Sequence, residues 1–102
     1  MTLIAETQVE TAKAAKYLKW LCGHFKLKVP AEYDDHQGRV QFPFGVCQLH
    51  ARPDALTIRV EADDADAFAR VKHVVGDHLE RFGRKEALQV VWLDQPSREQ
   101  AG

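Results

Sequence analysis

The stretch WLCGHF, which begins at Trp20, places a cysteine and a histidine two residues apart, as in a metal-binding pair or a nucleophile with its base. Its surroundings predict a helix over residues 11–26, because Thr11 can cap the first turn and alanine, lysine and leucine fill the body. Cys22 and His24 are then about 200° apart around the helix axis and point to nearly opposite sides. We therefore expect Cys22 in the core as a small hydrophobic residue, and no site formed by the pair.

His24 instead continues a second stripe on this helix. It follows Lys13, Tyr17 and Trp20 at positions i, i+4, i+7 and i+11, beside the apolar stripe. Two aromatic residues and a histidine away from the core face indicate a contact surface for a partner chain or a flat ligand. The alternative is that Tyr17 and Trp20 cover a sheet edge or lie beneath the terminal segments.

A second helix, predicted over residues 63–86, carries two further candidates. His78 lies at the margin of its apolar stripe, with Arg81 beside it on the outer side. Burial and the neighbouring like charge would both disfavour a charged imidazole, which suits a neutral acceptor or a metal ligand. The alternative is a histidine satisfied by a backbone carbonyl or a carboxylate. His24 and His78 could approach each other if the helices lie side by side, but no sequence argument places them there.

The segment YDDHQGR, residues 33–39, combines two carboxylates, a histidine and an arginine, which could bind a hard cation or transfer a proton. The same residue types are ordinary between two strands, with Gly38 supplying a positive φ, and the spacing of a calcium loop is absent. We therefore predict a hairpin turn here.

Alternating apolar and polar residues predict a sheet with one packed face and one wet face. The predicted strands cover residues 2–9, 38–44, 46–51, 56–62 and 88–93, and another runs from residue 28 into the hairpin loop. The order is strand, helix, several antiparallel strands, helix, strand. It predicts an α+β fold, a two-layer sandwich of a mostly antiparallel sheet with two helices on one face.

The wet face of this sheet is a further candidate surface for an anionic or polar ligand. Its predicted side chains are Arg39, Gln41, Gln48, His50, Thr57 and Arg59. No aromatic residues interleave them for base stacking, and 14 Lys and Arg balance 15 Asp and Glu in the chain. We therefore expect no nucleic-acid partner.

The length of 102 residues indicates one domain, which we place at residues 1–94, followed by a polar tail at 95–102 that we expect to be disordered. No apolar run approaches the roughly 18 residues that span a bilayer. The N-terminus has no basic or hydrophobic signal region, so we expect a cytoplasmic protein with no membrane partner. Cys22 and Cys47 are then two reduced thiols.

Familiar catalytic motifs are missing from the sequence. It contains no glycine-rich phosphate loop, no GxSxG elbow and no HExxH motif. This argues against an enzyme of a familiar class, and we predict no catalytic residue, no bound metal and no cofactor.

Three segments carry a family resemblance: AAKYLKWLCGHF, YDDHQGRVQFPFG and VVGDHLERFGRKEALQVVW. Together they resemble a family of small bacterial proteins catalogued as domain of unknown function 2218, over about residues 8–92. The matching residues are Tyr17, Leu18, Cys22, His24, Phe25, Gly38, Phe42, Gly45, His78, Leu79, Arg81, Phe82 and Trp92. The resemblance implies a bacterial origin and a loose association with iron and siderophore utilisation, because such domains occur with siderophore-interacting flavoproteins. It implies no catalytic residue.

We therefore expect an accessory protein that binds a ligand or a protein partner, loosely linked to iron or siderophore utilisation. Its contact surface would consist of Tyr17, Trp20, His24, His78 and Arg81. Arg81 would receive an anionic group of the ligand. Two alternatives stay open: a small metal-binding protein or enzyme built on His24 and His78, and a structural homo-oligomer with the aromatic stripe as its interface.

Overall fold

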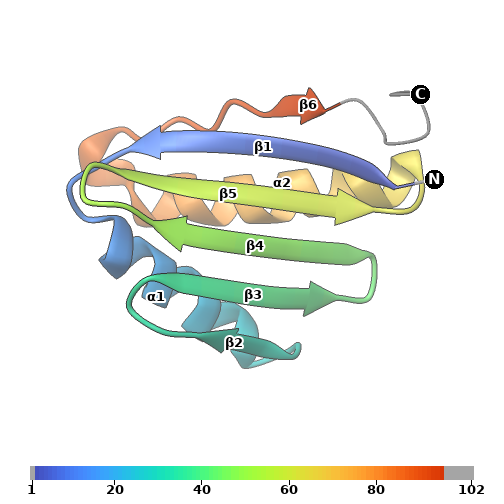
Figure 1. The fold of residues 1–102 in the computed structure, drawn as a ribbon, viewed down its shortest axis with the longest axis horizontal. Helices are drawn as coiled ribbons and strands as arrows, with labels where there is room; N and C mark the ends of the chain where they lie inside the picture. The colour runs from blue at the N-terminus through green and yellow to red at the C-terminus, as the bar shows by residue number, and fades with distance from the viewer. Residues whose placement is uncertain (1, 96–102) are drawn as a thin grey trace.

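The computed structural model describes residues 2–95, and Figure 1 shows how their elements are arranged. In chain order these are β1 (Leu3–Glu10), α1 (Ala14–Lys26), β2 (Ala31–Tyr33), β3 (Gln37–Phe42), β4 (Gly45–Ala51), β5 (Ala55–Ala62), α2 (Ala65–Phe82), the short 3-10 helix η1 (Arg84–Glu86) and β6 (Leu93–Gln95). Residues 96–102, most of the predicted polar tail, lie outside the described residues.

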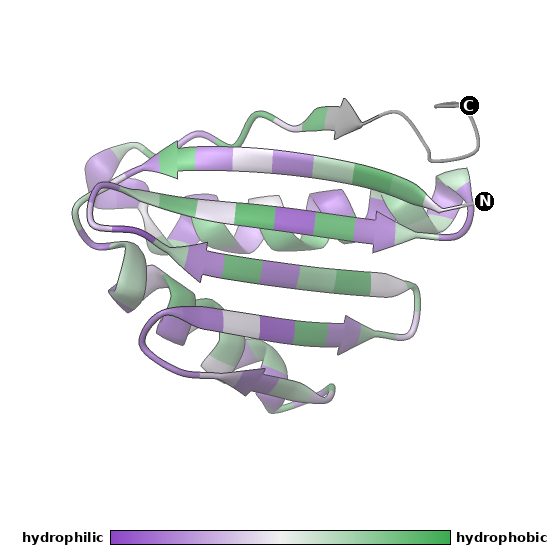
Figure 2. Ribbon diagram, viewed as in Figure 1, coloured by the Kyte–Doolittle hydropathy of each residue, from purple (hydrophilic) through white to green (hydrophobic). Residues whose placement is uncertain are grey.

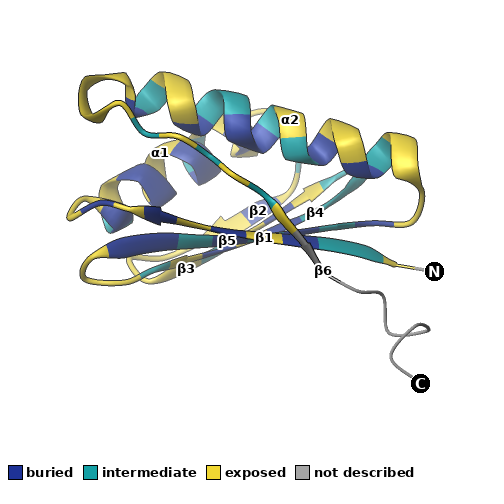
Figure 3. Cartoon of the chain, turned by 90° about the horizontal axis from the view of Figure 1, so that it is seen from above, coloured by how far each residue is buried: buried dark blue, intermediate teal, exposed yellow. Residues whose placement is uncertain are grey.

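Six strands form one antiparallel sheet in the order β2-β3-β4-β5-β1-β6. Both helices lie on one face of this sheet and leave the other face open (Figure 3). The predicted α+β sandwich is therefore confirmed. Within residues 2–95, neither helix is long and apolar enough to cross a membrane.

The core lies between the sheet and the helices, and the alternation along β5 shows why. Leu56, Ile58 and Val60 are buried, whereas the residues between them are half-exposed. Figure 2 shows the same alternation as bands of opposite hydropathy along the central strands. The register places Ala5 of β1 and Cys47 of β4 on either side of Val60, so one face of the sheet is continuously apolar.

Both cysteines belong to this core. Cys22 on α1 and Cys47 on β4 are free and buried, in agreement with the expectation of two reduced thiols. Burial raises the pKa of the Cys22 thiol to about 11 and that of the Cys47 thiol well above its usual value. Neither is a thiolate near neutral pH, so both pack as small hydrophobic side chains.

The predicted N-cap of α1 is wrong. The helix begins at Ala14, and no side chain caps it. The Thr11 hydroxyl accepts a hydrogen bond from the Lys13 N–H at 3.0 Å and donates one to Glu86 at 2.9 Å. The chain makes a turn at residues 12–13 before the helix begins, and the Thr11 oxygen accepts from an N–H of that turn instead of one in the helix.

The second helix is shorter than predicted. Asp64 caps it by accepting a hydrogen bond from the Ala67 N–H at 2.7 Å, but the helix ends at Phe82 rather than at residue 86. Beyond it the chain turns back through η1. A Cβ atom on Gly83 would lie only 2.2 Å from Leu88 Cδ1, so the tight return requires glycine at the end of the helix.

The predicted strand at residues 88–93 is also wrong, except at Leu93, which begins β6. Residues 88–92 instead run across α2. Val90 and Trp92 pack over Gly76, where a Cβ atom would lie 3.4 Å from Trp92 Nε1. Leu88, Val90 and Trp92 are half-buried, whereas Gln89 and Val91 are exposed, so only one side of the segment is covered.

Candidate functional site

The two candidate histidines lie side by side where α1 packs against α2. The ring centroids of His24 and His78 are 4.9 Å apart, and the ring planes are tilted by 42°. Phe25 lies edge-on to His78 at 5.0 Å, and Phe82 lies edge-on to His24 at 5.8 Å. We call these four residues the histidine seam. The approach of His24 and His78 that the sequence left open therefore occurs.

The imidazole of His78 is oriented by the backbone of its own helix. Its Nδ1 lies 2.7 Å from the Val74 carbonyl oxygen. Because a carbonyl oxygen only accepts, Nδ1 carries the proton and donates it. The half-buried ring is thus satisfied by a backbone carbonyl, as one of the two interpretations predicted, and Nε2 is left for another partner.

Trp20 extends the seam at the surface. Its side chain is 44% exposed, and its ring meets Tyr17 and Phe82 edge-on at 5.7 and 5.9 Å. The Lys16 ammonium lies 4.6 Å from the ring centroid. These contacts come from α1 and α2, so within the described residues the ring does not cover a sheet edge.

Tyr17 is not part of this surface, and its prediction as a contact residue is wrong. Its side chain is only 3% exposed, and its hydroxyl donates a hydrogen bond to Glu86 Oε2. Burial, together with the hydrogen bond to Glu86, raises the pKa of Tyr17 to about 12. The hydrogen bond from Tyr17 in turn lowers the pKa of the Glu86 carboxyl.

The sequence did not indicate a role for Glu86. It accepts hydrogen bonds from both Tyr17 and Thr11, and so ties η1 to the start of α1. Its partners lie 69 and 75 residues away along the chain, and no local spacing indicates such a contact. Its role is structural.

Arg81 lies at the rim of the seam, on the exposed side of α2. Its Nε is 3.1 Å from Asp77 Oδ2, one turn back along the helix. The pair is largely solvated, so it contributes little to stability. The guanidinium is accessible, and its role in receiving an anionic group stays a prediction.

The loop between β2 and β3 is a turn, as predicted. Asp34 Oδ1 accepts hydrogen bonds from the N–H groups of His36 and Gln37, at 2.7 and 2.9 Å, and the His36 bond is the main reason that the pKa of Asp34 is lowered. Gly38, however, does not have a positive φ. Glycine is needed there because a Cβ atom would lie 2.6 Å from Cys22 Sγ.

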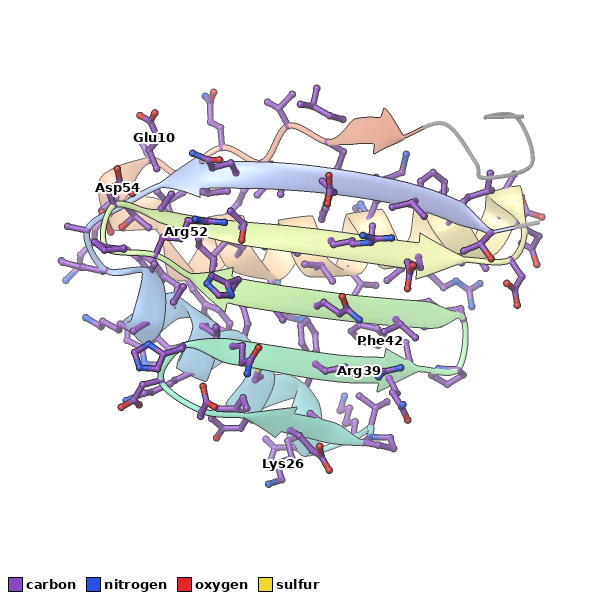
Figure 4. The ribbon with its side chains drawn as sticks, viewed as in Figure 1. Glu10, Lys26, Arg39, Phe42, Arg52 and Asp54 are labelled. Carbon is purple, nitrogen blue, oxygen red and sulfur yellow. The ribbon has the colours of Figure 1, made fainter. Side chains whose placement is uncertain are left out.

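The open face of the sheet carries a broad cavity of about 850 Å³. Its polar lining includes Gln48, His50, Thr57 and Arg59, four of the six side chains predicted for the wet face. Figure 4 looks onto this face and labels Arg39 on β3, which stands across β4 from Arg59.

Arg59 is the least satisfied group on that face. Its Nη2 lies 3.4 Å from Glu61 Oε1, a long contact, and its buried Nε has no hydrogen-bond partner. The strand register places Gln48 on one side of it and Glu6 on the other. A guanidinium beside an amide can receive an oxyanion, although the neighbouring carboxylates of Glu6 and Glu61 oppose it.

The two surfaces present different chemical groups. The seam presents aromatic edges and imidazole nitrogens, and the open face presents a guanidinium, amides and the carboxylates of Glu6, Glu32 and Asp34. Within residues 2–95, no group of three or more histidine, cysteine, aspartate or glutamate side chains gathers as a metal cluster.

Comparison with known proteins agrees with the fold. The profile of a family described as uncharacterized proteins conserved in bacteria, DUF2218, matches residues 6–93. The NMR structure of PA4090 from Pseudomonas aeruginosa is similar, with a TM-score of 0.75 and 32% sequence identity over 89% of this chain and 95% of that chain. No curated protein sequence matches. The chain thus belongs to the bacterial family of domain of unknown function 2218.

Proposed function

We propose that this chain is a non-catalytic, cytoplasmic binding module that docks on a protein of iron or siderophore utilisation. The docking surface consists of Trp20, His24, His78 and Arg81. The class of partner comes from the loose association with siderophore-interacting flavoproteins that the family resemblance implies.

One observation carries the proposal: the three segments on which the family resemblance rests meet at the histidine seam. The first contributes His24 and Phe25, and the third contributes His78 and Phe82. The second contributes Phe42, whose ring lies 5.0 Å from that of Phe25. Beside this meeting point stands an exposed tryptophan, the residue type most enriched at binding hot spots.

The test is an NMR titration of the isotope-labelled chain with a purified siderophore-interacting flavoprotein from the same organism. We expect shifts at the outer faces of α1 and α2, and Trp20→Ala should weaken binding at least tenfold. Gln48→Ala, on the open face of the sheet, is the matched control and should bind normally. Shifts confined to the open face, or no binding at all, would refute the proposal.

A second candidate function is the binding of a small anionic ligand on the open face. The cavity of about 850 Å³ lies within the range of ligand sites, and the Arg59 side chain in its lining is 40% exposed, so the guanidinium can meet an anionic group. A thermal-shift screen with ferric siderophores, citrate and flavins tests it. Stabilisation that is lost in Arg59→Gln but kept in Trp20→Ala would assign the ligand to this face.

A further inference from the structure

We propose that His24 and His78 form a two-histidine site for one divalent transition-metal ion, of the class of Zn²⁺, Ni²⁺ and Cu²⁺, which bridges α1 and α2. This inference rests on the same seam as the proposed function, but it concerns a different ligand and can fail separately. The remaining positions on the ion would be filled by water or by a donor group from a partner.

The separation of the rings fits a shared ion. Two imidazoles that bind one tetrahedral ion through nitrogens at about 2.0–2.1 Å have ring centroids about 5 Å apart. The observed separation between His24 and His78 is 4.9 Å. The backbone of two packed helices therefore already holds the rings at the distance that an ion requires.

The hydrogen bond of His78 supplies the orientation that metal ligands have. A histidine bound to a metal almost always donates its other ring N–H to a carbonyl or a carboxylate, which fixes the tautomer and the ring plane. His78 Nδ1 donates to the Val74 carbonyl at 2.7 Å, so the lone pair of Nε2 is free to bind.

The neighbours of the pair hold it in place without competing for the ion. Phe25 lies against His78, and Phe82 lies against His24, both edge-on. These apolar walls restrict rotation of the rings and strengthen electrostatic contacts beside them. His24 itself is exposed, so an ion can enter from solvent.

A site with two protein ligands keeps positions open, which distinguishes it from a closed structural zinc site. Since imidazole nitrogens follow the general order of affinity among divalent ions, Cu²⁺ should bind more tightly than Ni²⁺ or Zn²⁺. An open position also lets a donor from a docked partner complete the coordination.

The experiment uses the untagged chain, freed of metal with a chelator and titrated with CuCl₂, NiCl₂ or ZnCl₂. Thermal unfolding is followed, together with the combined fluorescence of Trp20 and Trp92, in which bound Cu²⁺ should quench the contribution of Trp20. At a metal concentration one hundred times the dissociation constant, the melting temperature should rise by about 10–20 °C.

Matched variants locate the ion. His24→Ala should weaken binding at least tenfold, and His78→Asn should do the same while keeping an N–H donor for the Val74 carbonyl. His73→Ala, at an exposed histidine of α2, should leave binding unchanged. Absence of any melting shift in the parent chain, or an equal shift in His24→Ala, would overturn the proposal.

The two proposals are separated by repeating the flavoprotein titration in the presence of a chelator. If the NMR signals of the seam residues shift with the partner but not with metal ions, only the metal-site proposal is refuted. Metal binding that depends on His24 and His78, without any partner binding, would support the site and refute the docking function.

Discussion

At the scale of single residues, the hydrogen bond from Tyr17 to Glu86 joins α1 to the 3-10 helix η1. Tyr17→Phe removes the buried hydroxyl and keeps the ring. Because Glu86 lies at the surface and can turn to water, we expect a modest loss of about 1 kcal/mol in the free energy of unfolding. Urea denaturation measures it. An unchanged midpoint would show that the bond does not contribute to stability.

Ionisation of the Tyr17 hydroxyl should make the free energy of unfolding depend on pH in the alkaline range. The pKa of Tyr17 is raised from its ordinary value of 10.0 to about 12, with burial as the main cause. A raised pKa contributes stability that is complete below pH 10 and is lost as the pH rises towards 12. The advantage of the parent chain over Tyr17→Phe should therefore disappear in that window. Urea denaturation of the two chains between pH 8 and 12 measures it, and an advantage of the parent chain that persists unchanged at pH 12 would contradict the prediction.

At the scale of elements, the contact between β3 and α1 depends on Gly38. A Cβ atom there would lie 2.6 Å from Cys22 Sγ and 3.1 Å from Tyr33 Cβ. Gly38→Ala should destabilise the fold by about 1–3 kcal/mol, because the strand can no longer approach the helix so closely. Chemical denaturation provides the measurement.

A second substitution identifies the cause. Adding Cys22→Ala removes the nearer of the two contacts, so the double variant should recover part of the loss. Gly23→Ala, inside α1, meets only the hydroxyl of a flexible tyrosine at 3.3 Å and should stabilise the chain by about 0.5–1 kcal/mol. If Gly38→Ala is as harmless as Gly23→Ala, the close approach is not what requires glycine.

How far the sequence predicts an element depends on whether its pattern is local. The alternation of Leu56, Ile58 and Val60 identifies β5, because each residue meets the same face of the sheet. The strand prediction at residues 88–92 was wrong because burial alternates there as it does in a strand, but Val90 and Trp92 pack on Gly76 of α2 and not on a paired strand. The cap predicted at Thr11 was wrong because the helix begins only at Ala14, after a turn whose Lys13 N–H donates to the Thr11 oxygen.

The candidate site likewise has a part that the sequence predicts and a part that it does not. Helical periodicity places Trp20 and His24 away from the core, and the structure agrees that both are exposed. Periodicity could not reveal that Tyr17 is covered by Glu86, nor that His24 meets His78, because both depend on how distant segments pack. The parts of the site that join two helices therefore require the structure.

At the scale of the whole molecule, we predict that the isolated chain is a monomer. Of the five exposed large hydrophobic residues in the described part of the chain, only Trp20 belongs to the docking surface. A stable dimer buries about 1,200–2,000 Å² of surface, usually around several apolar anchors, whereas one exposed tryptophan suits a transient contact. Light scattering on the eluting protein should therefore give the mass of one chain, 11.6 kDa, at micromolar concentration.

Measuring the mass of Trp20→Ala as well shows whether the seam binds a second copy of this chain or is free for a different protein. If the parent chain and Trp20→Ala both elute as monomers, the exposed tryptophan is free for a different protein. If the parent chain is a dimer and Trp20→Ala is a monomer, the seam binds a second copy of the chain, as the homo-oligomer alternative requires. A dimer that survives the substitution would place the contact elsewhere, such as at the edge strands β2 and β6, whose outer backbone groups can pair with another chain.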